Sequence, residues 1–194
     1  MRTIDCRGQQ CPQPVIKTRK TMLAEPGTTL QILVDDQVCS DNVSRLAATL
    51  GYAINVEDTG EMIRLELTPG ETPAKVVAGG GVSGPTIIFI GSDQMGHGDS
   101  KLGQILMKNF IFTLIESDTI PDAIYCVNNG VKLTLGGSDV IEPLAELAYR
   151  GVDIASCGLC LEFFGAKESL AIGRISNMLE LINALQGAGN IIRL

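Results

Sequence analysis

The sequence predicts an α/β protein of two domains, and three of its features support this fold class. Strand-like and helix-like segments alternate in the order βαβαββ over residues 1–68 and alternate again over residues 86–194. A segment rich in glycine and proline, residues 69–85, separates the two halves. The run 86–91 is continuously apolar, as expected of a parallel strand that is buried on both faces. We therefore expect an N-terminal two-layer α/β sandwich, a flexible linker, and a mostly parallel open sheet with helices on both faces.

Two prolines mark the start of the first helix. Proline is favoured in the first helical turn, because the N–H group that it lacks would have no partner within the helix. Pro12 and Pro14 therefore predict a helix over residues 12–24, after a short strand at residues 3–4. The inward face of this helix is expected to carry four apolar side chains: Val15, Ile16, Met22 and Leu23.

The rest of the N-terminal half completes a small sheet. Apolar residues that alternate with polar ones predict strands, and capping residues and glycines set the ends of the second helix. The predicted elements are a strand at 30–34, a helix that Asp35 and Asp36 can cap and that Gly51 ends, and two strands at 53–57 and 62–67 that form a hairpin.

The C-terminal half alternates strands with helices after its first apolar strand. A glycine-rich loop at residues 92–100 follows that strand. The later elements are helices at 101–116 and 141–150, a short helix within 157–164, a helix from Ser176 as N-cap to 186, and strands at 122–127, 152–156 and 190–194. Binding sites in parallel sheets lie beyond the C-terminal ends of the strands, so the loops at 92–100 and 157–160 are the expected site region.

Cys11 lies directly before the Pro-x-Pro start of the first helix. The positive end of a helix favours an anion, and a helix start beside basic residues lowers the pKa of a thiol, which is about 8.5 in a free cysteine. The first twenty residues carry one acid, Asp5, against five basic residues: Arg2, Arg7, Lys17, Arg19 and Lys20. We therefore predict that Cys11 is a nucleophile; the alternative is a small buried thiol at a helix start.

The N-terminal half resembles the TusA (SirA-like) sulfur-carrier domains. The resemblance extends to about residue 68 and is carried by the CPxP motif and its surroundings: Asp5, Gly8, Cys11, Pro12, Pro14 and the basic amphipathic helix that follows. In that family the cysteine before the proline carries a persulfide sulfur between proteins. The resemblance therefore implies that role for Cys11, with Pro12 and Pro14 as the scaffold of the helix start.

The C-terminal half, residues 86–194, is similar to the DsrE-like sulfurtransferase domains. The likeness is one of topology, of a glycine-rich loop after the first strand, and of a cysteine-bearing turn after a later strand. A TusA-like half joined to a DsrE-like half resembles the YedF proteins, a family grouped with selenium metabolism. The DsrE-like resemblance also implies homo-oligomers, trimers or hexamers, formed through the C-terminal domain.

A second thiol site is predicted at Cys157 and Cys160, which form a CxxC motif between a strand and a helix. The pair could receive sulfur from Cys11 and release it by forming a disulfide, or act as a dithiol redox site. It could also supply half of a zinc site, but the chain has no second CxxC to complete four ligands. Two ordinary buried cysteines are the structural alternative. We expect no metal and no cofactor.

The remaining cysteines and the single histidine are predicted to have structural roles. Cys6 is interpreted as a strand-end residue rather than a resolving thiol for Cys11, and Cys39 and Cys126 as core residues. His97 lies in a glycine-rich turn that fits neither the P-loop pattern nor the dinucleotide fingerprint, so we expect no nucleotide. A solvated histidine in a surface turn is the simplest interpretation.

Composition and charge argue against several classes of function. The net charge of −7 argues against nucleic-acid binding, which needs a basic footprint. No signal peptide and no membrane-spanning apolar run is present, so we expect a cytoplasmic protein whose cysteines are not structural disulfides. The predicted partners are a protein sulfur donor, such as a cysteine desulfurase, and a protein acceptor.

The sequence thus predicts a sulfur carrier that relays a cysteine persulfide through Cys11 to Cys160 or Cys157, or to another protein. Selenium is an alternative cargo. Whether the protein acts as a sulfurtransferase enzyme stays open at this stage. Two other functions also remain: a protein-binding module without catalysis, and a thiol–disulfide redox switch.

Overall fold

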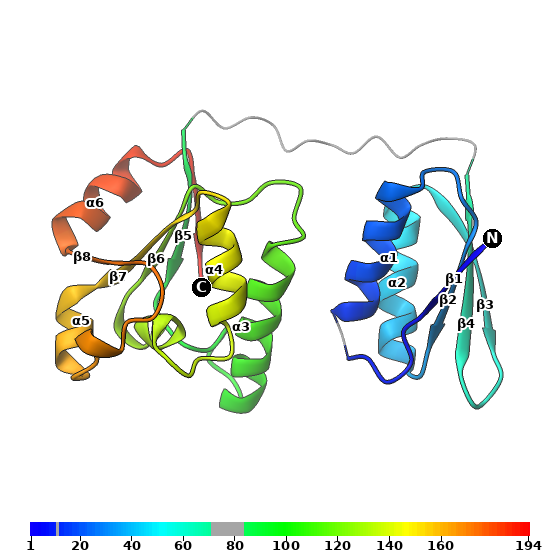
Figure 1. The fold of residues 1–194 in the computed structure, drawn as a ribbon, viewed down its shortest axis with the longest axis horizontal. Helices are drawn as coiled ribbons and strands as arrows, with labels where there is room; N and C mark the ends of the chain where they lie inside the picture. The colour runs from blue at the N-terminus through cyan, green and yellow to red at the C-terminus, as the bar shows by residue number, and fades with distance from the viewer. Residues whose placement is uncertain (11, 71–83) are drawn as a thin grey trace. The chain divides into compact units, whose positions relative to one another are not determined.

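The computed structural model of the 194-residue chain describes residues 1–10, 12–70 and 84–194. The chain divides into two compact units, Met1–Gly80 and Gly81–Leu194, each with its own sheet and helices (Figure 1). Cys11 lies outside the described residues, and so does most of the predicted linker, residues 71–83. The predicted α/β fold class is confirmed.

The N-terminal unit is a four-stranded sheet in the order β1-β2-β4-β3, with both helices on one face (Figure 1). The β1 strand is parallel to β2, whereas β4 is antiparallel to both β2 and β3. The elements are β1 (Arg2–Asp5), α1 (Gln13–Ala24), β2 (Leu30–Val34), α2 (Gln37–Thr49), β3 (Tyr52–Asp58) and β4 (Ile63–Pro69).

Side-chain periodicity builds the core of this unit. Leu30, Ile32 and Val34 alternate toward the helices, and Leu65, which pairs with Ile32, is also fully buried. One prediction for α1 is wrong: Leu23 is 57% exposed rather than part of the core. Its neighbour Met22 takes the inward position, and the next residue of a helix is turned about 100° away.

The start of α2 depends on a side-chain cap at Asp36. The Asp36 carboxylate accepts the N–H of Cys39 at 2.7 Å, and this hydrogen bond lowers the pKa of Asp36. We expect Asp36→Ala to reduce the free energy of unfolding by about 1 kcal/mol, measured by urea titration at pH 7. Because the folded state lowers this pKa, the contribution is present above the ordinary value of 3.8 and is lost as the pH falls through the lowered value. A loss that persisted unchanged at pH 2 would contradict this explanation.

The C-terminal unit is a five-stranded, wholly parallel sheet in the order β8-β7-β6-β5-β9. Its elements are β5 (Thr86–Ile90), α3 (Ser100–Leu114), β6 (Ala123–Cys126), the 3₁₀ helix η1 (Asn128–Thr134), α4 (Ile141–Tyr149), β7 (Asp153–Cys157), α5 (Gly158–Phe163), the 3₁₀ helix η2 (Lys167–Ser169), β8 (Arg174–Ser176), α6 (Met178–Gly187) and β9 (Asn190–Arg193).

Helices cover both faces of this sheet, as predicted. On one face, Ile88 and Ile124 pack with Met107 of α3 and Leu144 of α4. On the other face, alternate residues of the same strands pack with Leu181 of α6, and Figure 1 shows α6 on the side opposite to α3 and α4. A strand buried on both faces needs a continuous apolar sequence, which is what residues 86–90 provide.

The end of the chain differs from the prediction at its last helix. Ser176 is the final residue of β8, and the N-cap of α6 is Asn177, whose side chain accepts the N–H of Glu180 at 3.0 Å. Serine and asparagine are both good capping residues, so the sequence alone does not separate them. The edge strand β8 has only three residues, too few to show an alternating pattern.

Candidate functional site

The helix start after Cys11 forms where the prolines predict it. Pro12 is the N-cap of α1, and Pro14 is buried in the first turn. Cys11 itself lies outside the described residues, so its role as nucleophile stays a prediction.

The basic surroundings of this helix start are partly neutralised. The Arg7 guanidinium donates to both Asp5 carboxylate oxygens, at 2.9 and 2.6 Å, and its main-chain N–H adds a third hydrogen bond at 3.1 Å. These hydrogen bonds lower the pKa of Asp5 to about 2. Because Arg7 is paired with Asp5, it attracts another anion less strongly than an unpaired arginine would. The exposed Lys17 lies one turn into α1 and is close enough to act on Asp5 electrostatically.

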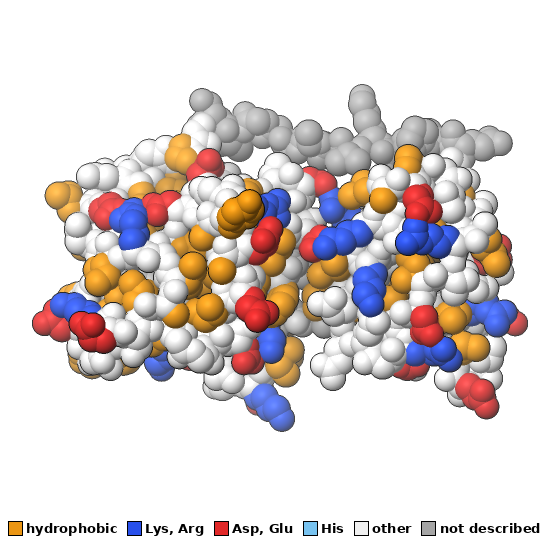
Figure 2. Space-filling view, in the orientation of Figure 1, with side chains coloured by type: hydrophobic (Ala, Val, Ile, Leu, Met, Phe, Trp, Pro, Cys, Tyr) orange, Lys and Arg blue, Asp and Glu red, His pale blue; other side chains and the backbone are white. Residues whose placement is uncertain are grey.

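The first helix carries an excess of basic side chains. The α1 sequence carries Lys17, Arg19 and Lys20 and has no acidic residue. On the face shown in Figure 2, lysine and arginine side chains gather over the helices of the N-terminal unit. The positive charge of α1 favours the approach of acidic groups.

Two other thiols of this unit are core residues. Cys6, directly after β1, and Cys39 of α2 are both almost fully buried in the hydrophobic core. Burial raises the pKa of Cys6, which keeps its thiol protonated at neutral pH. These environments match the strand-end and core positions expected for Cys6 and Cys39.

The CxxC motif lies at the C-terminal edge of the parallel sheet. Cys157 is the last residue of β7 and the N-cap of α5, and Cys160 lies in the first turn of that helix. Cys157 is 7% exposed and belongs to the core, whereas Cys160 is partly exposed. In many CxxC sites the first thiol is the reactive one. Here the second thiol, Cys160, is the more exposed of the two.

A residue that follows the neighbouring strand contacts Cys160. The main-chain N–H of Asn128 donates to Cys160 Sγ at 3.1 Å. Asn128 follows β6, which pairs in parallel with β7, and parallel neighbours end at the same sheet edge. Asn128 was not among the predicted site residues, although Asn-Asn-Gly after a strand is a recognisable turn signal.

The backbone of Asn128 has an unusual conformation. Its φ angle is +50°, and no other non-glycine residue in the described ranges has a positive φ. Asparagine tolerates this region better than most residues, yet it still costs about 1 kcal/mol. Such local strain is often found at functional sites.

Contacts around η1 hold Asn128 in place. The Oγ atoms of Thr134 in η1 and Ser156 in β7 are 2.8 Å apart and fully buried, which links the 3₁₀ helix to the strand that carries Cys157. Gly130 lies directly against the carbonyl of Ile90 in β5. The position of the Asn128 N–H is therefore set by both neighbouring strands.

An apolar cavity of about 350 Å³ opens beside Cys160. Its lining residues are Asn128, Leu159, Cys160, Phe163 and Phe164. Leu159 and Phe163 are 75% and 82% exposed, so they form an exposed apolar rim around the cavity. Burial, followed by hydrogen bonding with the Cys157 side chain, raises the pKa of Cys160. The Cys160 thiol is therefore mostly protonated at neutral pH.

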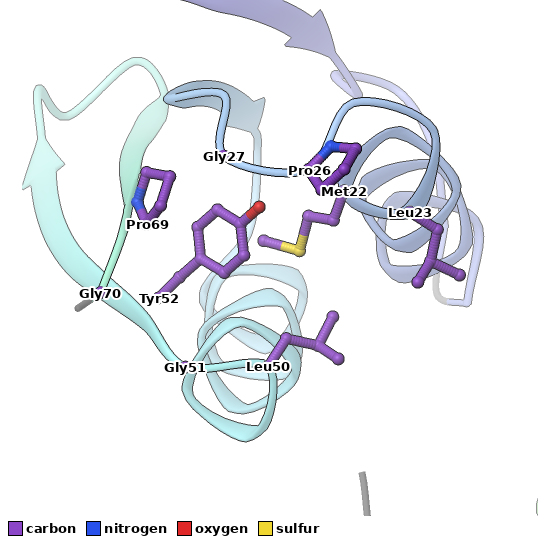
Figure 3. A pocket seen from close by; sticks show the side chains of 9 residues that line it. All are labelled: Met22, Leu23, Pro26, Gly27, Leu50, Gly51, Tyr52, Pro69 and Gly70. Carbon is purple, nitrogen blue, oxygen red and sulfur yellow. The ribbon is translucent and has the colours of Figure 1, made fainter. Parts of the chain in front are cut away.

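A separate hollow of about 320 Å³ lies in the N-terminal unit, at the C-terminal end of α1 (Figure 3). The Met22 side chain points toward the Tyr52 ring across it, and Leu23 lies at its rim. Because α1 has 12 residues, its two ends are about 18 Å apart. This hollow therefore lies far from the helix start that follows Cys11.

His97 is exposed, as expected for a surface turn. It lines a hollow of about 480 Å³ together with Ser92, Gln94 and Arg193, where the loop after β5 meets β9. Within residues 1–10, 12–70 and 84–194, no cluster of histidine, cysteine or acidic side chains could hold a metal ion. The same ranges contain no helix with the length and apolar character of a membrane span.

Comparisons with known proteins identify the N-terminal half. The family model described as "Sulfurtransferase TusA" matches residues 2–68. A protein of Archaeoglobus fulgidus named as a putative sulfur carrier protein is 38% identical over 55 residues, which are 28% of this chain and 71% of the relative.

Three solved structures are similar to parts of the chain. A SirA-like protein from Desulfitobacterium hafniense is 34% identical, with a TM-score of 0.34, and the match covers 37% of this chain and all of that protein. The ychN protein of E. coli is 17% identical, with a TM-score of 0.46, over 57% of this chain and 99% of that one. The protein MTH1491 from Methanobacterium thermoautotrophicum, of unknown function, is 19% identical, with a TM-score of 0.42, over 56% of this chain and 97% of its own.

The identification rests on the sequence matches. The matched region contains β1, the Cys-Pro-x-Pro helix start and the four-stranded sheet described above. Through residues 2–68, the chain belongs to the TusA sulfurtransferase family.

Proposed function

We propose that this protein relays a persulfide sulfur between proteins through two thiol sites. Cys11 receives the sulfur from a protein donor, such as a cysteine desulfurase, and passes it to the Cys157–Cys160 pair or to an acceptor protein. The single observation that supports this best is the family match over residues 2–68, which contains the CPxP motif. Selenium is the alternative cargo.

The proposal assigns a role to each part of the chain. Residues 1–68 are the carrier domain, residues 69–85 the linker, and residues 86–194 a DsrE-like sulfurtransferase domain. A chain with a carrier thiol in one unit and a CxxC pair in the other suits transfer between sites. The donor and acceptor act in the cytoplasm, and homo-oligomers form through the C-terminal domain.

The first transfer is a thiol attack on a persulfide. The Cys11 thiolate attacks the outer sulfur of the donor persulfide, and the sulfur–sulfur bond breaks. The electron pair leaves with the donor cysteine as a thiolate, and the outer sulfur remains on Cys11 as a new persulfide. The start of α1 and the exposed Lys17 favour the anionic form.

The test is to incubate the full chain with a cysteine desulfurase and cysteine, and to weigh the cysteine-containing peptides. We expect the mass of one added sulfur atom on the Cys11 peptide, and none there in Cys11→Ala, because alanine cannot hold a sulfane sulfur. The matched control is Cys39→Ala, which removes a buried thiol of the same unit and leaves loading intact.

One result would reject the proposal. If an unrelated carrier protein is loaded by the same desulfurase while Cys11 stays unmodified, Cys11 is not a sulfur acceptor. Selenium is tested in the same assay with selenocysteine as substrate and a selenocysteine lyase as donor, read from the isotope pattern of the peptide.

A thiol–disulfide switch is the second candidate, and the direct interaction between the Cys157 and Cys160 side chains favours it. It predicts that the pair titrates between dithiol and disulfide within the cytosolic range of potential. A pair that stays reduced across that range, followed by peptide mass in thiol–disulfide buffers, excludes the switch.

A further inference from the structure

We infer that Cys160 is the thiol that takes up sulfur at the CxxC site, that Cys157 is the resolving thiol, and that the main-chain N–H of Asn128 positions the reacting sulfur. This inference deepens the proposed function and rests on it for the source of sulfur. It assigns an order that is the reverse of the usual one, in which the first cysteine of a CxxC motif reacts first.

Access distinguishes the two thiols. Cys160 lines the open cavity of about 350 Å³, whereas Cys157 is 7% exposed and packs into the core beneath it. An incoming persulfide must place its outer sulfur in line with the attacking thiol, which needs free space around that thiol. Only Cys160 has such space on the side of the cavity.

Asn128 donates a main-chain hydrogen bond to Cys160. Its N–H lies 3.1 Å from Cys160 Sγ, close enough to donate to a thiolate or to a persulfide. Asn128 presents this N–H from a backbone conformation with positive φ, and the buried contact between Thr134 and Ser156 fixes the 3₁₀ helix that follows. A preorganised donor stabilises negative charge on sulfur without reorganisation during the reaction.

Two balanced steps follow from this arrangement. In the first, the Cys160 thiolate attacks the outer sulfur of a protein persulfide, the donor cysteine leaves as a thiolate, and Cys160 becomes a persulfide. In the second, Cys157 loses its proton and attacks Cys160 Sγ, and hydrosulfide leaves with the electron pair. The two cysteines are oxidised to a disulfide while the transferred sulfur is reduced, and a low-molecular-weight thiol then reduces the disulfide.

The apolar rim defines the kind of partner that delivers the sulfur. Leu159, Phe163 and Phe164 surround the cavity, so the arriving segment buries apolar side chains next to its persulfide. Charged low-molecular-weight persulfides lack this contact. We therefore expect them to load Cys160 more slowly than a protein persulfide does.

The first experiment measures reactivity at each thiol of the full chain carrying Cys11→Ser. Iodoacetamide alkylation is followed by peptide mass between pH 6 and 10. We expect Cys160 to react at least about tenfold faster than Cys157. Faster alkylation of Cys157 overturns the assigned order.

The second experiment tests Asn128 with a matched pair of variants in the same Cys11→Ser chain. Asn128→Val disfavours positive φ and displaces the N–H, so we expect the pH profile of Cys160 alkylation to move upward by about one unit, a roughly tenfold slower reaction at neutral pH. Asn128→Gly keeps the left-handed conformation and should retain the wild-type profile. If both variants match the wild type, or if both shift equally, Asn128 does not position the sulfur.

A third measurement separates this inference from the relay itself. Glutathione persulfide is added directly to the Cys11→Ser chain, so that no transfer from Cys11 is needed. Sulfur found on Cys160, or a Cys157–Cys160 disulfide with released hydrosulfide, supports the inference even if a desulfurase never loads Cys11. Sulfur that appears on Cys157 in the Cys160→Ala background as fast as on Cys160 in the intact pair overturns it.

Discussion

Replacing Cys157 with alanine is expected to stop the reaction at the CxxC site with one sulfur atom held on Cys160. Without the resolving thiol, the persulfide on Cys160 has no neighbouring nucleophile to release hydrosulfide. In a single turnover with a persulfide donor and no added thiol, wild-type protein should release one hydrosulfide per chain and end as the Cys157–Cys160 disulfide. The variant should give a stable Cys160 peptide heavier by one sulfur atom and only background hydrosulfide.

Cys126→Ala is the matched control for this prediction. Cys126 is another fully buried thiol of the same unit, and burial raises its pKa to about 12, so we expect it to stay protonated and unreactive at neutral pH. The control should release hydrosulfide at the wild-type rate. Hydrosulfide release that is undiminished in Cys157→Ala would show that Cys157 does not resolve the persulfide.

Replacing Gly130 with alanine is expected to cause the largest loss of stability among the residues around the site. A Cβ atom at this position would lie closer to the Ile90 carbonyl oxygen than real structures allow, and 3.0 Å from the carbonyl carbon. Because both atoms belong to the backbone of β5, neither can rotate away. We expect the free energy of unfolding of the C-terminal unit to fall by about 3 kcal/mol, measured by urea titration.

Gly136→Ala provides the control, because it lies shortly after η1 and its Cβ would meet only the Ser169 carbonyl oxygen at 3.8 Å, an ordinary contact. It should change the stability by less than about 0.5 kcal/mol. In the Gly130→Ala protein that remains folded, η1 must shift, so Cys160 alkylation should also slow down. Equal stability of the two variants would show that the close approach of η1 to β5 does not restrict the size of the residue at position 130.

The elements that were predicted correctly share one property: their signals are local. The strand at residues 86–90 was recognisable because a strand buried on both faces is apolar at every position. The start of α1 was recognisable because two prolines within three residues suit only a few backbone positions. The errors occurred where local signals are ambiguous, as at Ser176 and Asn177, or where packing selects between adjacent apolar residues, as at Met22 and Leu23.

The sequence predicted only part of the candidate site at Cys160. The CxxC motif marked a thiol pair and the strand–helix boundary marked its place at the sheet edge. The sequence could not predict that Asn128 belongs to this site, because 32 residues separate Asn128 from Cys160. A hydrogen bond between a main-chain N–H and a thiol also leaves no pattern in side-chain types.

The sequence by itself determined the fold class, the order of most elements, the family of residues 2–68 and the place of Cys11 before the first helix, since these follow from periodicity, capping and motif residues close together in the chain. The tertiary structure decided which thiol of the CxxC pair is exposed and which main-chain N–H donates a hydrogen bond to it. Both depend on the parallel pairing of β6 with β7, which places the end of one strand beside the end of the other.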